Sequence, residues 1–97
     1  MKIKIGINGM GRIGRMILRT IIETNNKNIL INHINNKANS ESCSSLLKYD
    51  SIHGKFDAKI NFDKNHLIIN QNKISYSQEA DLKNIKWKKF DVDYVFE

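Results

Sequence analysis

The sequence predicts an α/β fold: part of a doubly wound parallel sheet with a small antiparallel β insertion. Three observations support this prediction. Apolar and polar residues alternate from Lys2 to Ile7, and a glycine-rich turn and an amphipathic helix pattern follow directly. A second strand–helix repeat comes next. After Gly54 short alternating runs are separated by turn residues. The chain of 97 residues holds one domain at most, and it is too short for all the strands of a complete doubly wound sheet.

The turn after the first strand carries three glycines in the spacing Gly-x-Gly-x-x-Gly, at Gly9, Gly11 and Gly14. The first allows a tight turn, the second lets the backbone approach a pyrophosphate, and the third lets the helix pack close to the sheet. The N-terminus of the following helix presents unpaired N–H groups to phosphates. The segment therefore predicts a Rossmann-type dinucleotide-binding unit in which the backbone N–H groups of Arg12 and Ile13 face the pyrophosphate.

The spacing of apolar residues predicts the next two elements. A helix is expected over Arg12 to Glu23, because isoleucine and leucine recur there at helical intervals. A strand should begin at Ile29 and end near Asn35 and Asn36. These two elements complete the first strand–helix–strand unit.

A short second helix is predicted over Glu41 to Lys48, with Ser40 as its N-cap and with Leu46 and Leu47 directed inward. The only cysteine, Cys43, lies in the middle of this helix. A catalytic thiol needs a base that lowers its pKa and donors for an oxyanion, and neither is evident here. We interpret Cys43 as structural, and a lone cysteine fits a reducing compartment.

The segment after Gly54 predicts two or three short antiparallel strands, peripheral to the main sheet. Apolar residues alternate from Phe56 to Phe62, a turn follows at Asp63–Asn65, and strand patterns resume at His66–Asn70 and around Ile74.

The last part of the chain predicts irregular structure and then one more strand. Residues Asp81 to Lys89 have no clear period, and Trp87 is expected to pack against the sheet. Asp93 to Glu97 begins another parallel strand, which is cut off at the end of the sequence. We therefore expect the chain to be an N-terminal fragment.

The formal net charge of +6 raises the alternative of nucleic-acid binding. The lysines are scattered rather than gathered on one helix face, which favours a solvated surface and no nucleic-acid partner. No apolar run reaches 18 residues and no secretory signal is evident, so we predict no membrane partner and a cytoplasmic protein.

The glycine segment and its surroundings resemble one family. Asn8 to Arg15 is similar to the N-terminus of phosphorylating glyceraldehyde-3-phosphate dehydrogenases. The resemblance covers essentially the whole chain and continues through separated blocks in the family's order, at Leu46–Phe56, Leu67–Asn70, Ile74, Gln78–Glu79, Ile85–Trp87 and Tyr94–Glu97.

The resemblance implies that residues 1–97 form the N-terminal part of an NAD(P)-binding Rossmann domain, with the catalytic domain absent. The family's catalytic cysteine and histidine have no counterparts here, so no catalytic residue is assigned and the fragment alone should be inactive. The resemblance further implies that the full-length enzyme is a homotetramer that oxidises and phosphorylates glyceraldehyde 3-phosphate in glycolysis and gluconeogenesis. An erythrose 4-phosphate dehydrogenase fragment and a standalone nucleotide-binding module stay open as alternatives.

The end of the second strand bears on the choice between NAD and NADP. A carboxylate that accepts from the ribose hydroxyls is expected there, about 20 residues after the glycines. The resemblance places Asn36 where the family usually has aspartate, and Lys37 follows. An amide removes the charge that repels a 2′-phosphate, and a lysine attracts one. We therefore favour NADP or dual specificity over strict NAD, against the alternative of a turn asparagine and a solvated lysine.

Four further residues receive roles from their positions. Asn8 ends the first strand and is expected to fix the loop by hydrogen bonds. The resemblance places Ala80 beside the adenine, where a backbone contact would survive the absence of the family's arginine. Arg15 and Arg19 are expected to face solvent or a subunit interface.

The histidines do not predict a metal site. His33 and His66 lie in strand patterns, and His53 lies in a turn where a structural or interfacial role is expected. None has cysteines or carboxylates at metal-ligand spacing.

Overall fold

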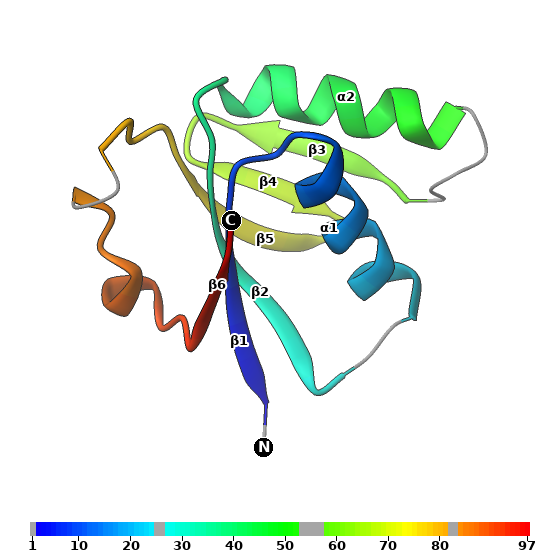
Figure 1. Ribbon diagram of the computed structural model, residues 1–97. Helices are drawn as coiled ribbons and strands as arrows, with labels where there is room; N and C mark the ends of the chain where they lie inside the picture. The colour runs from blue at the N-terminus through cyan, green and yellow to red at the C-terminus, as the bar shows by residue number, and fades with distance from the viewer. Residues whose placement is uncertain (1, 25–26, 53–57, 82–83) are drawn as a thin grey trace.

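The strands form one mixed sheet in a computed structural model that describes residues 2–24, 27–52, 58–81 and 84–97. Within these residues the strand order is β3-β4-β5-β2-β1-β6, as Figure 1 shows. The bounds are β1 (Ile3–Asn8), β2 (Ile29–Asn35), β3 (Ile60–Asp63), β4 (His66–Ile69), β5 (Asn72–Ser77) and β6 (Tyr94–Phe96). The predicted α/β class is confirmed.

The parallel part of the sheet has the order expected for half of a doubly wound fold. β1 pairs in parallel with β2 and β6, and β2 pairs in parallel with β5. The chain therefore adds β2 and β5 on one side of β1 and later adds β6 on the other side. This reversal is a topological switch point, and ligands of open α/β sheets bind outside the carboxyl ends of the strands at such a point.

The antiparallel strands are continuous with this sheet. β3 pairs with β4 and β4 pairs with β5, both antiparallel, while β5 also pairs with β2. The predicted antiparallel insertion exists at the periphery of the main sheet, where β3 and β4 extend one of its edges. β5 joins the parallel and antiparallel parts of the sheet, because one of its edges pairs in parallel with β2 and the other pairs antiparallel with β4. The expectations for His53 and Phe56 lie outside the described residues.

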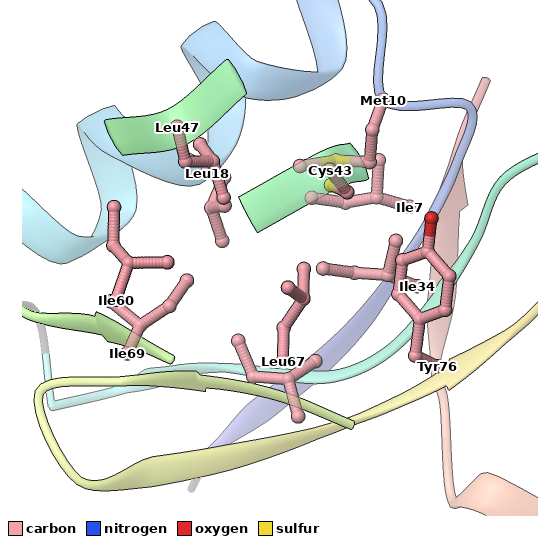
Figure 2. Packing of buried hydrophobic residues seen from close by; sticks show 11 residues of the cluster. Ile7, Met10, Leu18, Ile34, Cys43, Leu47, Ile60, Leu67, Ile69 and Tyr76 are labelled. Carbon is pink, nitrogen blue, oxygen red and sulfur yellow. The ribbon is translucent and has the colours of Figure 1, made fainter. Parts of the chain in front are cut away.

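Two helices contribute to a core on one face of the sheet. α1 (Arg12–Thr24) matches its predicted span, and α2 (Ser40–Ile52) is longer than predicted. Figure 2 shows side chains from both helices and from the strands directed toward one another. The buried cluster consists of Ile7, Met10, Leu18, Ile34, Cys43, Leu47, Ile60, Leu67, Ile69, Ile74 and Tyr76.

The start of α2 differs from the prediction. Asn39 is the N-cap: its side-chain Oδ1 accepts from the Ser42 N–H at 2.8 Å, and its carbonyl accepts from the Cys43 N–H. Ser40 is the first helical residue and is buried, and its hydroxyl donates to the Asp63 carbonyl at 2.6 Å. The prediction of Ser40 as N-cap was wrong because two adjacent residues could cap, and contact with β3 draws Ser40 inward.

The inward face of α2 carries Cys43 and Leu47, both with no exposed surface. They lie four residues apart and therefore share one face of the helix. Leu46 is 44% exposed, so the expectation that it points inward was wrong. Burial raises the pKa of the Cys43 thiol to about 11, because the charged thiolate is poorly solvated there. This agrees with a structural role for Cys43.

An aromatic cluster lies on the sheet at Gly6 and His33. Trp87 and Phe90 belong to the 3₁₀ helix η2 (Trp87–Phe90). A Cβ on Gly6 would lie 2.5 Å from a Trp87 ring carbon, so glycine leaves the space that the indole occupies. The His33 ring stacks on Phe90 with centroids 3.8 Å apart and meets Trp87 edge-on at 5.4 Å. The predicted packing of Trp87 on the sheet is confirmed.

His33 is buried in this cluster and uses one of its ring nitrogens in a hydrogen bond. Nε2 lies 2.8 Å from the Ser77 hydroxyl oxygen, while Nδ1 is buried with no hydrogen-bond partner. Burial lowers the pKa of His33 to about 4, because a charged imidazolium would be poorly solvated there. The imidazole is therefore neutral near pH 7.

None of the helices among the described residues has the length and apolar character needed to cross a bilayer.

Candidate dinucleotide-binding site

The predicted site residues gather at the carboxyl ends of β1, β2 and β5. Three segments leave the sheet there: residues 9–11 after β1, 36–39 after β2 and 78–81 after β5. In Figure 1 the blue loop after β1 lies next to the teal segment that connects β2 with α2. Because the strands are parallel, their carboxyl ends share one edge of the sheet, beside the topological switch point.

A different structural reason explains why each of the three positions in the motif is a glycine. Gly9 has a φ of +98°, which side chains rarely tolerate. A Cβ on Gly14 would lie 2.2 Å from the Gly9 carbonyl oxygen, so α1 reaches the loop only without a side chain there. A Cβ on Gly11 would meet no atom within 4 Å. Gly11 is therefore not required by packing within the described chain, and the open space beside it fits the close approach of a ligand.

The N-terminus of α1 borders this space. The Gly11 carbonyl accepts the first helical hydrogen bond, from the Arg15 N–H at 3.0 Å, so Gly11 is the N-cap residue. Glycine has no side-chain oxygen to cap the following N–H groups of Arg12 and Ile13. Both residues are exposed, Ile13 by 67%. An uncapped helix start with open space before it is suited to bind an anion such as a pyrophosphate.

Asn36 lies against the glycine loop. Its side-chain Oδ1 accepts from the Met10 N–H at 3.1 Å, and its own N–H donates to the Ser77 carbonyl at 3.0 Å. The residue is half-buried, and Met10 is buried in the core. Asn36 thus joins the loop after β1 to the end of β2, which brings the predicted ribose and pyrophosphate positions together.

The segment after Asn36 is held to the end of β5. The Tyr76 hydroxyl donates to the Ala38 carbonyl at 2.6 Å, and the Gln78 side-chain amide donates to the Lys37 carbonyl at 3.1 Å. The Lys37 side chain itself is exposed. It therefore presents a cation at the rim of the candidate site.

Asn35 was not among the predicted site residues, yet its side chain connects the three strand ends. It is 3% exposed. Its Nδ2 donates to Asn8 Oδ1 at 3.0 Å and to the Glu79 carbonyl at 2.9 Å. Its Oδ1 accepts from the Ser77 hydroxyl at 2.7 Å and from the Glu79 N–H at 2.8 Å. The sequence signal was a polar residue at the end of an apolar strand, which by itself does not distinguish a buried amide from a turn residue.

Two other predicted residues lie beside these contacts. Asn8 accepts the hydrogen bond from Asn35, so its amide helps to fix the end of β1. Ala80 is exposed and follows Glu79, whose backbone is held on both sides by Asn35. The structure therefore brings Asn8, the glycine loop, Asn36, Lys37 and Ala80 to one edge of the sheet.

Of the two positions expected for Arg15, solvent or a subunit interface, the first is not observed. Its Nε lies 3.2 Å from an Asp50 side-chain oxygen, and these side chains are only 18% and 13% exposed. Its guanidinium also donates to the Met10 carbonyl at 3.3 Å. Arg15 therefore links the glycine loop, α1 and α2. The sequence did not show this, because Asp50 is 35 residues away.

The hollow beside this ion pair lies between α1 and α2. It has a volume of about 420 Å³ and is lined by Arg12, Arg15, Met16, Arg19, Tyr49 and Asp50. Arg19 is half-buried, and its Nε is buried with no hydrogen-bond partner. Arg19 was expected to face solvent or a subunit interface, and within this chain it faces solvent only in part.

A second and larger hollow among the described residues contains none of the predicted cofactor-binding residues. Its volume is about 740 Å³, and it lies beside the amino-terminal half of β2, between the end of α1 and the β4–β5 turn. β2 pairs with β5 over His33–Asn35, and its preceding residues, Ile29 to Asn32, do not pair with β5. Among the described residues, no group of three or more His, Cys, Asp or Glu side chains is placed to hold a metal ion.

Comparison with known proteins gives one consistent result. Residues 3–97 match the family model described as "Glyceraldehyde 3-phosphate dehydrogenase, NAD binding domain". The chain is 43% identical over 95 residues to glyceraldehyde-3-phosphate dehydrogenase of Bacteroides fragilis, covering 98% of this chain and 28% of the relative. It is 41% identical over 97 residues to glyceraldehyde-3-phosphate dehydrogenase A of Escherichia coli, covering 100% and 29%. The chain thus spans under a third of the length of these relatives.

Proposed function

Because this chain belongs to the family of glyceraldehyde 3-phosphate dehydrogenase NAD-binding domains, we propose that it holds the pyrophosphate and adenosine half of NAD(P) for such a dehydrogenase. The observation that carries the proposal is the open space at Gly11 before the uncapped start of α1. A pyrophosphate in this space accepts from the N–H groups of Arg12 and Ile13. When bound, the nicotinamide accepts the hydride, and the protein supplies its position.

The adenosine half of the cofactor has its candidate partners at the ends of β2 and β5. In this proposal Asn36 hydrogen-bonds the ribose, and the backbone around Ala80 borders the adenine. Asn8 and Gly9 fix the turn that leads to the pyrophosphate. The hydrogen bonds among these segments support the assignment, because they place the groups along one edge before any ligand binds.

The proposal includes use of NADP, either by preference or together with NAD. Asn36 turns its Oδ1 toward the Met10 N–H, so the other end of its amide is an N–H donor. A 2′-phosphate only accepts hydrogen bonds near neutral pH, so it suits a donor and the exposed Lys37 cation better than it suits a carboxylate.

The chemistry of the whole enzyme belongs to the same proposal. The complete protein would oxidise and phosphorylate glyceraldehyde 3-phosphate as a cytoplasmic homotetramer, with its catalytic cysteine and histidine outside these 97 residues. Cys43 is buried and its pKa is raised, so it is a poor nucleophile. This supports a catalytic cysteine outside these 97 residues. The chain alone would then bind cofactor without catalysing the reaction.

The first experiment titrates the chain with NAD and with NADP and follows backbone amide NMR signals. We expect both to shift the signals of Gly11, Arg12 and Ile13. Asn36→Asp should lower the affinity for NADP relative to NAD by about tenfold, since it replaces a donor with a charge of the phosphate's own sign. Lys37→Ala should also lower the affinity for NADP more than that for NAD, since it removes the cation beside the 2′-phosphate; Lys64→Ala, in the turn between β3 and β4, is its matched control and should change neither affinity. Unchanged spectra with both dinucleotides would contradict the binding proposal.

A second experiment addresses the dehydrogenase proposal. Residues 1–97 replace the matching segment of the Bacteroides fragilis relative, and NAD(P)H formation from glyceraldehyde 3-phosphate and phosphate is measured. We expect activity from the chimaera and none from the chain alone. A folded chimaera that binds cofactor but forms no NAD(P)H would argue against this part of the proposal.

A further inference from the structure

We propose that Asn35 is a positioning residue of the dinucleotide site, whose buried amide sets how the ends of β1, β2 and β5 lie relative to one another. This inference rests on the proposed function. Asn35 lies beneath the site, with 3% of its surface exposed, and acts on the cofactor through Asn8 and Glu79.

The Asn35 amide uses its full hydrogen-bonding capacity. A carboxamide has two N–H donors and an oxygen with two lone pairs. Nδ2 donates to the side chain of Asn8 and to the carbonyl of Glu79, while Oδ1 accepts from the Ser77 hydroxyl and the Glu79 N–H. The four bonds measure 2.7 to 3.0 Å. A buried and fully paired amide allows very little freedom to the groups that it contacts.

The orientation of this amide is fixed by its partners. If it were flipped, Nδ2 would face the Glu79 N–H, and two donors would meet without an acceptor. Oδ1 would then face the Glu79 carbonyl and form an equally unfavourable pair of acceptors. Aspartate has the same shape but no N–H donors, so Asn35→Asp removes the hydrogen bonds to Asn8 and to the Glu79 carbonyl while retaining both acceptor contacts.

The main-chain carbonyl of Asn35 adds a contact to the glycine loop. It accepts from the Gly9 N–H at 2.7 Å. One residue therefore reaches the first glycine of the loop, the end of β1 and the segment before Ala80. These are the parts that the proposed pyrophosphate and adenine positions require at a fixed separation, so a shift at Asn35 would disturb both halves of the site.

Asn32 offers a matched control on the same strand. Its Nδ2 donates to the carbonyls of Phe90 and Asp91 at 3.2 and 3.0 Å. Asn32→Asp therefore also removes two donated hydrogen bonds from an asparagine of β2. Its partners belong to η2 and the residue after it, away from the candidate site, so this variant reports the effect of losing two donated hydrogen bonds from β2 outside the site.

The test compares Asn35→Asp with Asn32→Asp in the 97-residue chain, using NAD as the probe. Dissociation constants come from amide NMR titrations well below each melting temperature. We expect Asn35→Asp to weaken NAD binding by about tenfold or more, as two hydrogen bonds to the site's frame are lost. Asn32→Asp should stay within about twofold of the parent chain. Without ligand, hydrogen exchange at the Gly9 and Glu79 amides should accelerate only in Asn35→Asp, because loss of the two donated bonds lets their segments open more often although the acceptors of both amides remain.

The outcomes separate the two proposals. Equal NAD affinity in Asn35→Asp and Asn32→Asp would overturn the positioning role while leaving the binding proposal intact. Failure of the parent chain to bind NAD would overturn both. If Asn35→Asp does not fold, Ser77→Ala removes one of the four bonds, together with the contact to His33 Nε2, and should weaken binding by about threefold. Unchanged affinity in Ser77→Ala would then contradict the inference.

Discussion

The two ends of the parallel strands are built differently. At the carboxyl end, side chains of Asn35, Asn36 and Ser77 tie β1, β2 and β5 to the loops that follow them. At the amino-terminal end of β2, the strand separates from β5 beside a hollow of about 740 Å³. The larger hollow has the weaker claim to function, because no predicted site residue lines it. A pocket is a candidate binding site when a few polar groups converge on it, and its volume alone does not make it one.

The largest expected effect comes from closing the space between α1 and the glycine loop. Gly14→Ala places a Cβ 2.2 Å from the rigid Gly9 carbonyl oxygen. We expect it to lower the free energy of unfolding by about 3 kcal/mol, the upper range for overpacking, and to abolish NAD binding. Urea unfolding and an NAD titration measure the two effects. Full stability in this variant would mean that the loop is not held as described.

The second prediction concerns His33, beneath the carboxyl end. Its pKa in the folded chain is about 4, below the ordinary value of 6.5, so the unfolded chain binds more protons between these values. The stability that depends on a neutral His33 is therefore fully present above pH 6.5. The free energy of unfolding should fall by about 3 kcal/mol as the pH drops from 7 to 4. Urea unfolding across this range measures the loss.

The controls for this pH dependence use the chain's own histidines. His33→Gln should flatten the loss of stability between pH 7 and pH 4. His66→Gln removes a half-exposed histidine in the β3–β4 turn region and should leave the loss attributable to His33 in place. The same steep loss in His33→Gln as in the parent chain would assign the pH dependence to other groups.

The third prediction separates Gly11 from its neighbours. A Cβ on Gly11 meets no atom within 4 Å, so Gly11→Ala should lower the free energy of unfolding by no more than about 1 kcal/mol, the cost of alanine in place of glycine at an N-cap. NAD binding should nevertheless weaken by about tenfold or more, because the methyl group occupies space that the pyrophosphate approaches. Calorimetric unfolding and an NAD titration give the two values. Unimpaired binding would show that the ligand does not approach at Gly11.

The smallest effect is expected at the hollow of about 740 Å³ beside the amino-terminal half of β2. Lys73 is exposed and lines this hollow. Lys73→Ala should change the free energy of unfolding by less than about 0.5 kcal/mol, as is usual for surface substitutions. Its dissociation constant for NAD should match that of the parent chain in the same titration. A marked loss of affinity would give the larger hollow a role in binding and remove the contrast between the two ends.

The sequence predicted the local features of the first βα unit correctly. β1, α1 and β2 lie where the apolar periods placed them, and Gly9 and Gly14 have the backbone roles that their spacing indicated. These features depend on residues that are close together in the chain. The match to the family model agrees with the resemblance seen in the sequence.

Tertiary structure decided the features that join distant residues. Arg15 pairs with Asp50, Asn39 instead of Ser40 caps α2 while Ser40 contacts β3, and Asn35 is the buried link among three strand ends. Local periodicity predicts which face of an element is apolar, but not which polar groups it will meet. A buried amide or ion pair is stable only when its partners arrive with the right geometry, and only the folded sheet brings those partners together.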